Sequence, residues 1–180
     1  MLRKSNFFFL PAVALTATLA VSSCTSHDHA TPTVAKLGVK NLSQPQPFIY
    51  SSGQPSKAQL ENLAKAGVKH VVNLRPTNEQ SWDEEKHVRS LGMNYVSIPI
   101  SGVADLTKAN AKKLDNAITI IGKDPALIHC ASGNRVGALI AIREATIKGK
   151  SQSQAIAKGK RWGLTGLKPG VQTRLTEMGY

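Results

Sequence analysis

The sequence predicts an α/β fold, a three-layer sandwich in which helices cover both faces of a central, mostly parallel sheet. Short apolar runs alternate with longer segments whose apolar residues recur at helical spacing. Residues typical of turns and helix ends separate these segments. The chain has 180 residues, 41% of them hydrophobic, which suits one domain with one core. Strands that alternate with helices in this way favour a parallel sheet.

The first predicted strand and helix follow a polar stretch. A short strand is expected at 48–50, followed by a turn at 51–55, where serine, glycine and proline cluster. Ser56 is typical of a helix N-cap and precedes a predicted helix at 57–66. Gly67 is expected to end that helix.

The rest of the chain repeats this alternation. Val71 and Val72 form the apolar centre of the second strand. Ala111 and Leu114 share the predicted core-facing side of the longest helix, and Ser81 is the expected cap of the helix before it. The predicted elements are, in order, a strand at 68–74, a helix at 82–91, a strand at 95–100, a helix at 107–122, a strand at 125–130 and helices at 135–148, 151–159 and 171–178.

The N-terminus is typical of an export signal. Arg3 and Lys4 supply a positive start, and residues 7–21 supply an apolar stretch too short to span a membrane comfortably. The run Val21-Ser22-Ser23-Cys24 then resembles the cleavage box of bacterial lipoproteins, in which the cysteine becomes the lipidated first residue.

These features predict three parts: a lipoprotein-type signal peptide at 1–23, a flexible tether at 24–45 and a folded domain at 46–180. Cys24 is the predicted lipidation site, which would anchor the domain to a bacterial membrane in the cell envelope. An ordinary secretory signal cut nearby is the alternative. Either route would deliver the domain outside the cytoplasm, to the periplasm.

The charge balance is strongly basic, with 23 Lys and Arg against 11 Asp and Glu, a formal net charge of +12. Such a surface suits a phosphorylated substrate, an anionic membrane or nucleic acid. The lysines are scattered along the predicted helices rather than gathered in a block, so we expect no nucleic-acid partner. His27 and His29 lie in the tether without further ligands, so no metal site is predicted there.

The most informative segment is 126–138, in which an apolar run ends at Cys130, a loop of small residues follows and Arg135 opens a helix. This order directs backbone N–H groups and the positive end of a helix at one spot, which attracts an oxyanion such as phosphate. The same field would favour the thiolate of Cys130, and Arg135 adds a planar, two-pronged donor. A cysteine at a strand end is otherwise usually a small buried hydrophobe.

This loop resembles that of the cysteine-dependent protein tyrosine and dual-specificity phosphatases. The stretches 50–55 and 67–76, together with Ile98-Pro99-Ile100, further resemble the phosphatase domains known as beta-lactamase-hydrolase-like. The resemblance covers about residues 48–164. It implies a phosphatase-type fold, hydrolysis of phosphate monoesters through a cysteinyl-phosphate intermediate, and neither a metal nor another cofactor. The substrate would be a phosphorylated small molecule or a phosphoprotein.

The resemblance also implies roles for single residues. Cys130 would be the nucleophile, and Arg135 would clamp the phosphoryl oxygens. His129 would orient the loop and hold the thiolate, or would only pack at the strand end. Gln54 and Arg75 are expected at the pocket rim, unless Arg75 is a surface salt-bridge partner. The N–H groups that would cradle the phosphoryl group, besides that of Arg135, belong to Ala131, Ser132, Gly133 and Asn134.

The general acid, which would protonate the leaving oxygen, is expected on a separate loop after a strand. Asp105 lies in such a loop and is the candidate. Its alternative role is to cap the helix that begins near Thr107. Glu79 and Asp83 lie on another loop and are poorer candidates.

Two features depart from the common phosphatase pattern. Four residues rather than five separate Cys130 from Arg135, a length that resembles the rhodanese-type sulfurtransferases, whose cysteine carries a persulfide. Val136 stands where these phosphatases usually carry a serine or threonine that stabilises the departing thiolate. Three functions therefore stay open: a phosphatase, a sulfurtransferase and a non-catalytic anion-binding module of the envelope.

Overall fold

The computed structural model describes Met1 and residues 33–180. The predicted signal peptide and Cys24 lie outside the described residues, so export, lipidation and a periplasmic location stay predictions. In chain order, the described elements are η1 (Val34–Lys36), β1 (Ser43–Gln46), β2 (Ile49–Ser52), α1 (Lys57–Lys65), β3 (His70–Asn73), η2 (Thr77–Glu79), α2 (Glu84–Ser90), β4 (Asn94–Ser97), η3 (Val103–Asp105), α3 (Lys108–Ile121), β5 (Ala126–His129), α4 (Asn134–Thr146), α5 (Gln152–Arg161) and α6 (Lys168–Glu177).

The central sheet has the strand order β1-β2-β5-β3-β4. β1 pairs antiparallel with β2 at one edge, and the other four strands are parallel. β5 is thus the central strand, with its Leu127 aligned to Tyr50 of β2 and to Val71 of β3. Because parallel strands point the same way, the segments that follow β2, β3, β4 and β5 all start at one edge of the sheet. That edge is where a site is expected.

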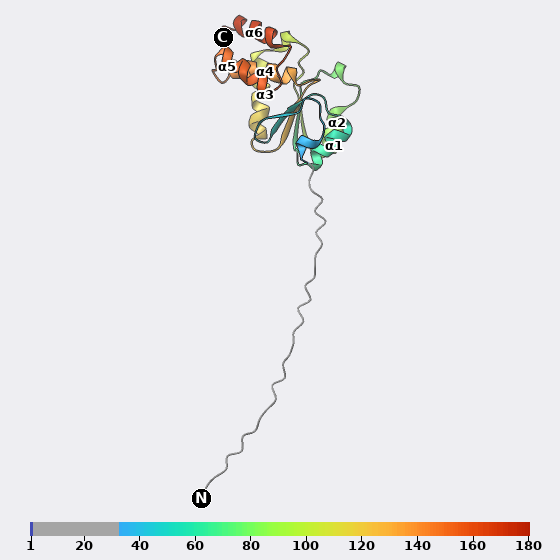
Figure 1. Ribbon diagram of the computed structural model, residues 1–180. Coiled ribbons are helices and arrows are strands. Elements are labelled where there is room, and N and C mark those ends of the chain that lie inside the picture. Colours follow the sequence, from blue (N-terminus) through green and yellow to red (C-terminus); the bar gives the residue numbers. More distant parts are fainter. Residues whose placement is uncertain (2–32) are drawn as a thin grey trace. The chain divides into compact units, whose positions relative to one another are not determined.

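Helices cover both faces of the sheet, with α1 and α2 on one side and α3 to α6 on the other (Figure 1). Neighbouring residues of a strand point to opposite faces. Accordingly Val71 and Leu127 belong to the cluster that packs against α1 and α2, while Val72 and Ile128 belong to the larger cluster against α3 to α6. The predicted α/β sandwich with a mostly parallel sheet is confirmed.

Side-chain caps fix where several helices begin. Ser56 caps α1 as predicted, in a reciprocal arrangement with Gln59. The helix expected at 82–91 instead begins at Glu84, because Asp83 rather than Ser81 accepts a backbone N–H of its first turn. An aspartate at this position also places negative charge at the positive helix end.

The domain begins earlier than the predicted boundary at residue 46. Val34 and Val39 are each only 5% exposed and pack in the cluster beside α1, and β1 pairs with β2. From residue 33 onward, the segment expected as a tether therefore belongs to the fold. The sequence of β1, Ser-Gln-Pro-Gln, lacks the alternation of an apolar strand. An edge strand does not need this alternation and can accommodate Pro45.

α4 is surrounded by the rest of the protein. The sequence predicts an amphipathic helix after the loop, but every residue from Val136 to Thr146 is buried. The neighbouring helix α5 can approach because two glycines meet: a Cβ on Gly137 would lie 2.5 Å from the Gly159 carbonyl oxygen. The same Cβ would lie 2.1 Å from the backbone nitrogen of Leu164. Both glycines are therefore required for this packing.

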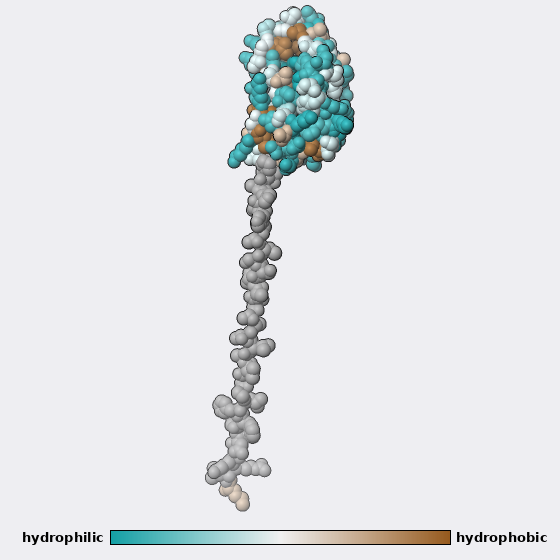
Figure 2. All heavy atoms as spheres, turned by 90° about the vertical axis from the view of Figure 1, so that its right-hand side faces the viewer, coloured by the Kyte–Doolittle hydropathy of each residue, from teal (hydrophilic) through white to brown (hydrophobic). Residues whose placement is uncertain are grey.

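The surface of the domain is mainly polar. Figure 2 shows hydrophilic side chains over most of the face that it presents, with small separate apolar areas. Large apolar side chains that are exposed within the described residues occur singly, at Met1, Phe48, Val96, Ile120 and Tyr180. None of the helices between residues 33 and 180 combines the length and the apolar character that a membrane crossing requires.

A buried ion cluster joins α3 to α4 and gives the first testable prediction. The Asp115 carboxylate lies 2.9 Å from Arg143 and 2.9 Å from the ammonium of Lys148. The hydrogen bond from Lys148, aided by the charge of Arg143, outweighs burial and lowers the pKa of Asp115 to about 2, from an ordinary value of 3.8. We expect Asp115→Asn to lower the free energy of unfolding by about 2 kcal/mol at neutral pH.

The sign of its pH dependence follows from that depressed pKa. The carboxylate stabilises the fold fully above its unfolded-state pKa, and this contribution is lost as the pH falls toward about 2. Urea unfolding curves of the variant and the wild type should therefore differ at neutral pH and converge in acid. A difference that stays constant down to the lowest pH would contradict this role of the ion cluster.

Candidate active site

The predicted anion-binding loop lies at the end of the central strand. β5 ends at His129, and the loop 130–133 leads into α4. Gly133 caps this helix with a positive φ of 87°, a conformation that favours glycine. Its N–H donates to the Sγ of Cys130 at 3.1 Å, and Cys130 is fully buried at the floor of the loop.

The remaining N–H groups of the loop are available to a ligand. Within residues 33–180 they have no hydrogen-bond acceptor, and two of them also belong to the first turn of α4. Unpaired N–H groups at a helix N-terminus form an anion site. They belong to Ala131, Ser132, Asn134 and Arg135.

Residues from both ends of the domain hold the loop in shape. Asn41 donates its side-chain amide to the Ser132 carbonyl at 3.0 Å, and the backbone N–H of Gln54 donates to the Ala131 carbonyl at 3.3 Å. The side-chain oxygen of Asn134 accepts the N–H of Thr165 at 2.9 Å, in the segment after α5. The Asn134 side-chain oxygen thus makes a structural contact. The backbone N–H of Asn134 is the group that remains for the predicted binding of an anion.

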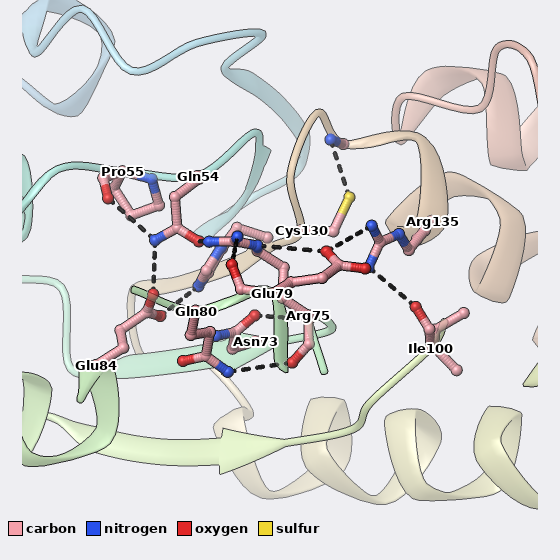
Figure 3. Close-up of polar contacts among 12 residues, drawn as sticks. Gln54, Pro55, Asn73, Arg75, Glu79, Gln80, Glu84, Ile100, Cys130 and Arg135 are labelled. Carbon is pink, nitrogen blue, oxygen red and sulfur yellow. Dashed lines mark hydrogen bonds and ion pairs between the residues drawn. The ribbon is translucent and has the colours of Figure 1, made fainter. Parts of the chain in front are cut away.

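Two acceptors fix the guanidinium of Arg135. Its Nη1 donates to the carbonyl oxygen of Ile100 at 3.0 Å, and its Nη2 contacts Glu79 Oε2 at 2.8 Å (Figure 3). The hydrogen bond from Arg135 lowers the pKa of Glu79, so the pair is ionised at neutral pH. The other N–H donors of the guanidinium remain for an anion. Sequence reasoning placed Glu79 among the poorer acids and missed this positioning contact.

Gln54 and Arg75, expected at the pocket rim, contact each other. Arg75 Nη1 donates to Gln54 Oε1 at 2.6 Å, and its Nη2 donates to the Glu79 carbonyl. Arg75 Nε lies 3.6 Å from Glu79 Oε2, the oxygen that Arg135 also contacts. Arg75 thus forms an ion pair with Glu79, as its alternative role predicts, but its guanidinium is only partly exposed and also binds Gln54.

His129 forms a buried pair with Glu84, a residue that the sequence did not single out. Its Nε2 lies 2.7 Å from Glu84 Oε1, and both side chains are at most 1% exposed. Burial alone would raise the pKa of Glu84, but hydrogen bonds from His129 and Gln54 outweigh it and the pKa lies below its ordinary value. His129 Nδ1 is buried without a hydrogen-bond partner among the described residues. The strand-end histidine therefore takes part in a polar network.

The candidate acid Asp105 is engaged in its own loop. Its carboxylate accepts the N–H of Ser101 at 2.7 Å. The alternative role as a helix cap is wrong, because Thr107 caps α3. The loop begins next to Ile100, whose carbonyl binds Arg135, so Asp105 lies on a segment adjoining the site.

Asp83, the other candidate acid, and Val136, which follows Arg135, have structural roles. The Asp83 carboxylate caps α2, as described above. Val136 is fully buried in the larger core cluster, and its side chain supplies no hydroxyl to the sulfur. Within the part of the chain that the structure describes, no cluster of side chains fits a metal ion.

Comparisons with known proteins agree with this geometry. A family model described as DSP-PTPase phosphatase fused to NAD+ kinase matches residues 29–168. The beta-lactamase hydrolase-like protein of Xylella fastidiosa is 32% identical over 98 residues, which make up 52% of this chain and 22% of that protein. The chain thus spans less than a quarter of the length of this curated relative.

Solved structures share the fold. The chain is similar to a DUF442 phosphatase described as putative from Shewanella putrefaciens CN-32, with 26% identity, a TM-score of 0.59 and coverage of 79% of this chain and 93% of that one. It is also similar to TpbA of P. aeruginosa, solved in complex with pTyr, with 19% identity, a TM-score of 0.53 and coverage of 75% and 82%. The second likeness supports the fold alone.

Proposed function

Because this chain belongs to the family of DSP-PTPase phosphatases, we propose that it hydrolyses phosphate monoesters through a phosphorylated Cys130. The arrangement of the sulfur carries the proposal: Cys130 Sγ lies buried beneath unpaired N–H groups and accepts the Gly133 N–H. A phosphoryl group in the loop would meet this sulfur on one side. Its equatorial oxygens would meet the N–H groups and Arg135, which stabilise the charge of the transition state.

The proposed reaction has two steps. In the first, the Cys130 thiolate attacks phosphorus, an S–P bond forms, and the P–O bond to the alcohol breaks. In the second, water attacks phosphorus, the S–P bond breaks, and the thiolate returns with inorganic phosphate as product. Asp105 is proposed to protonate the leaving oxygen in the first step and to accept a proton from water in the second.

The substrate class is proposed from the geometry and from one neighbour. The TpbA structure contains pTyr, which is an aromatic phosphate monoester. The loop of this chain contacts only a phosphoryl group in the scheme above, so we propose that aryl phosphates are accepted. Phosphotyrosine peptides and phosphorylated small molecules with an aromatic leaving group are both within this class.

The test is turnover of p-nitrophenyl phosphate by the purified domain with a chelator present, followed by acid quench and mass spectrometry of the peptide that contains Cys130. We expect release of nitrophenol and a phosphoryl adduct on that peptide. Thiocyanate formation from thiosulfate and cyanide, with a persulfide on Cys130 and no phosphatase turnover, would instead establish a sulfurtransferase. Stabilisation by phosphate without turnover of any monoester would establish an anion-binding module.

The role of Asp105 predicts a dependence on the leaving group. Asp105→Asn keeps an oxygen that can accept the Ser101 N–H, so the loop should hold its shape. A general acid contributes about 10²-fold or more when the leaving alcohol is a poor one. We therefore expect kcat/KM, which reports the first step alone, to fall by that factor with phenyl phosphate and far less with p-nitrophenyl phosphate. An equal loss with both esters would exclude Asp105 as the acid.

A further inference from the structure

Gln54 occupies an unusual place among the charged groups of the site. It follows β2, and its side-chain Nε2 donates to Glu84 Oε2 at 2.6 Å while its Oε1 accepts from Arg75 Nη1 at 2.6 Å (Figure 3). Glu84 is 1% exposed, and the Arg75 side chain is 17% exposed. The neutral amide therefore stands between a buried carboxylate and a largely buried guanidinium.

These two neighbours lead to the two ends of the catalytic loop. On one side, Glu84 binds His129, which directly precedes Cys130. On the other side, Arg75 contacts Glu79, and Glu79 binds Arg135. The contacts form a continuous polar chain from the start of the loop to its end, and the Gln54 amide is its central member.

We propose that Gln54 is a positioning residue that links the nucleophile end of the loop to its arginine end, and that this place requires a side chain able to donate and accept at once. The catalytic part of this inference rests on the proposed phosphatase function. A carboxylate at position 54 could only accept hydrogen bonds, and its negative oxygen would face the Glu84 carboxylate. An apolar side chain would leave Arg75 Nη1 and Glu84 Oε2 without this partner, and Arg75 Nε already lacks a hydrogen bond within residues 33–180.

The most informative variant is Gln54→Glu, because a protonated glutamic acid can still donate one hydrogen bond and accept another. A carboxylic acid donates through its hydroxyl to Glu84 and accepts from Arg75 through its carbonyl oxygen. The two carboxyl groups would share one proton, and loss of that proton would set two negative charges in contact. The titratable or charged groups facing this pair are Arg75, Glu79, His129, Tyr95 and, through Glu79, Arg135. The variant should therefore work in acid and fail as the pH rises.

The experiment compares pH profiles of kcat/KM for p-nitrophenyl phosphate in wild type and Gln54→Glu. We expect similar values at the acid end and a loss of about tenfold or more in the variant at the alkaline end, because misplaced catalytic groups cost rate steeply. Gln154→Glu is the matched control. It makes the same chemical change at an exposed capping position of α5, and its side-chain oxygen still accepts the Ser151 N–H.

Two further measurements separate a positioning role from a merely structural one. Gln54→Met removes the hydrogen bonds with Glu84 and Arg75, and a third to the Pro55 carbonyl, without adding a charge. Its kcat/KM should therefore be lowered at every pH with no new titration. The pH dependence of Cys130 alkylation and of stabilisation by inorganic phosphate should shift in Gln54→Glu in the same range as activity. Both readouts apply even if the wild type turns over no phosphate ester, an outcome that would reject the proposed function alone. A ratio of Gln54→Glu to wild type that is independent of pH in all readouts would overturn the inference.

Discussion

Cys130→Ser is expected to reduce turnover of phosphate monoesters by at least about 10³-fold, the scale of losing a nucleophile. The serine hydroxyl is nearly the same size as the thiol and can accept the Gly133 N–H that now binds the sulfur. A hydroxyl, however, is not ionised near neutral pH, and among the described residues no hydrogen bond joins the side chain of residue 130 to an imidazole that could take its proton: His129 Nε2 contacts Glu84. The loss should therefore lie in kcat.

The fold and the anion site should survive this change. Cys130 is fully buried, and the unpaired N–H groups and Arg135 are untouched by it. Stabilisation by inorganic phosphate or vanadate should thus remain in Cys130→Ser, measured by thermal unfolding at several ligand concentrations. Turnover that persists at a tenth of the wild-type value would show that the sulfur is not the nucleophile.

Arg135→Lys is expected to lower kcat/KM by about 10³-fold, near the lower end of what an arginine contributes at a phosphoryl group. Arg135 now holds Ile100 and Glu79 while keeping other donors for an anion. A lysine ammonium keeps the charge but is a point donor on a flexible stem, and it lacks the planar fork that can bind two oxygens at once. It cannot satisfy both protein acceptors and a phosphoryl group in the same geometry.

The control for this substitution is Arg161→Lys, at an exposed position in the last turn of α5. It should leave kcat/KM and phosphate binding unchanged. Arg135→Lys should also weaken the stabilisation by inorganic phosphate, which Cys130→Ser should not. If Arg135→Lys retained wild-type kcat/KM, the planar clamp would have no part in the reaction.

The loop that carries Cys130 was predictable because its information is local. An apolar strand, small residues and a helix start within a few positions of Cys130 determine where the N–H groups point. The alternation of short apolar runs with helical segments likewise predicts the sheet. Both depend on short-range patterns, and the structure confirms the fold they indicate.

The rest of the site was not predictable because its contacts join distant segments. Glu84 is 45 residues from His129, and Glu79 is 56 residues from Arg135. From the sequence alone, Glu79 resembles an exposed charge in a loop, and Glu84 resembles an exposed charge at the start of a helix. Only the parallel sheet brings the ends of β2, β3 and β5 to one edge, where these side chains meet. Asp83 and Thr107 took the capping roles by local geometry that the sequence leaves ambiguous.

The amide of Asn41, which binds the Ser132 carbonyl, has a practical consequence for protein engineering. Expression boundaries are commonly placed just before the first recognisable apolar strand, here near residue 47. Such a truncation would delete β1, expose the edge of β2 and remove the Lys40 carbonyl that accepts the Gly53 N–H. A fragment cut there would lose part of the scaffold of the loop that carries Cys130, and a loss of activity in the fragment would be mistaken for a property of the whole domain.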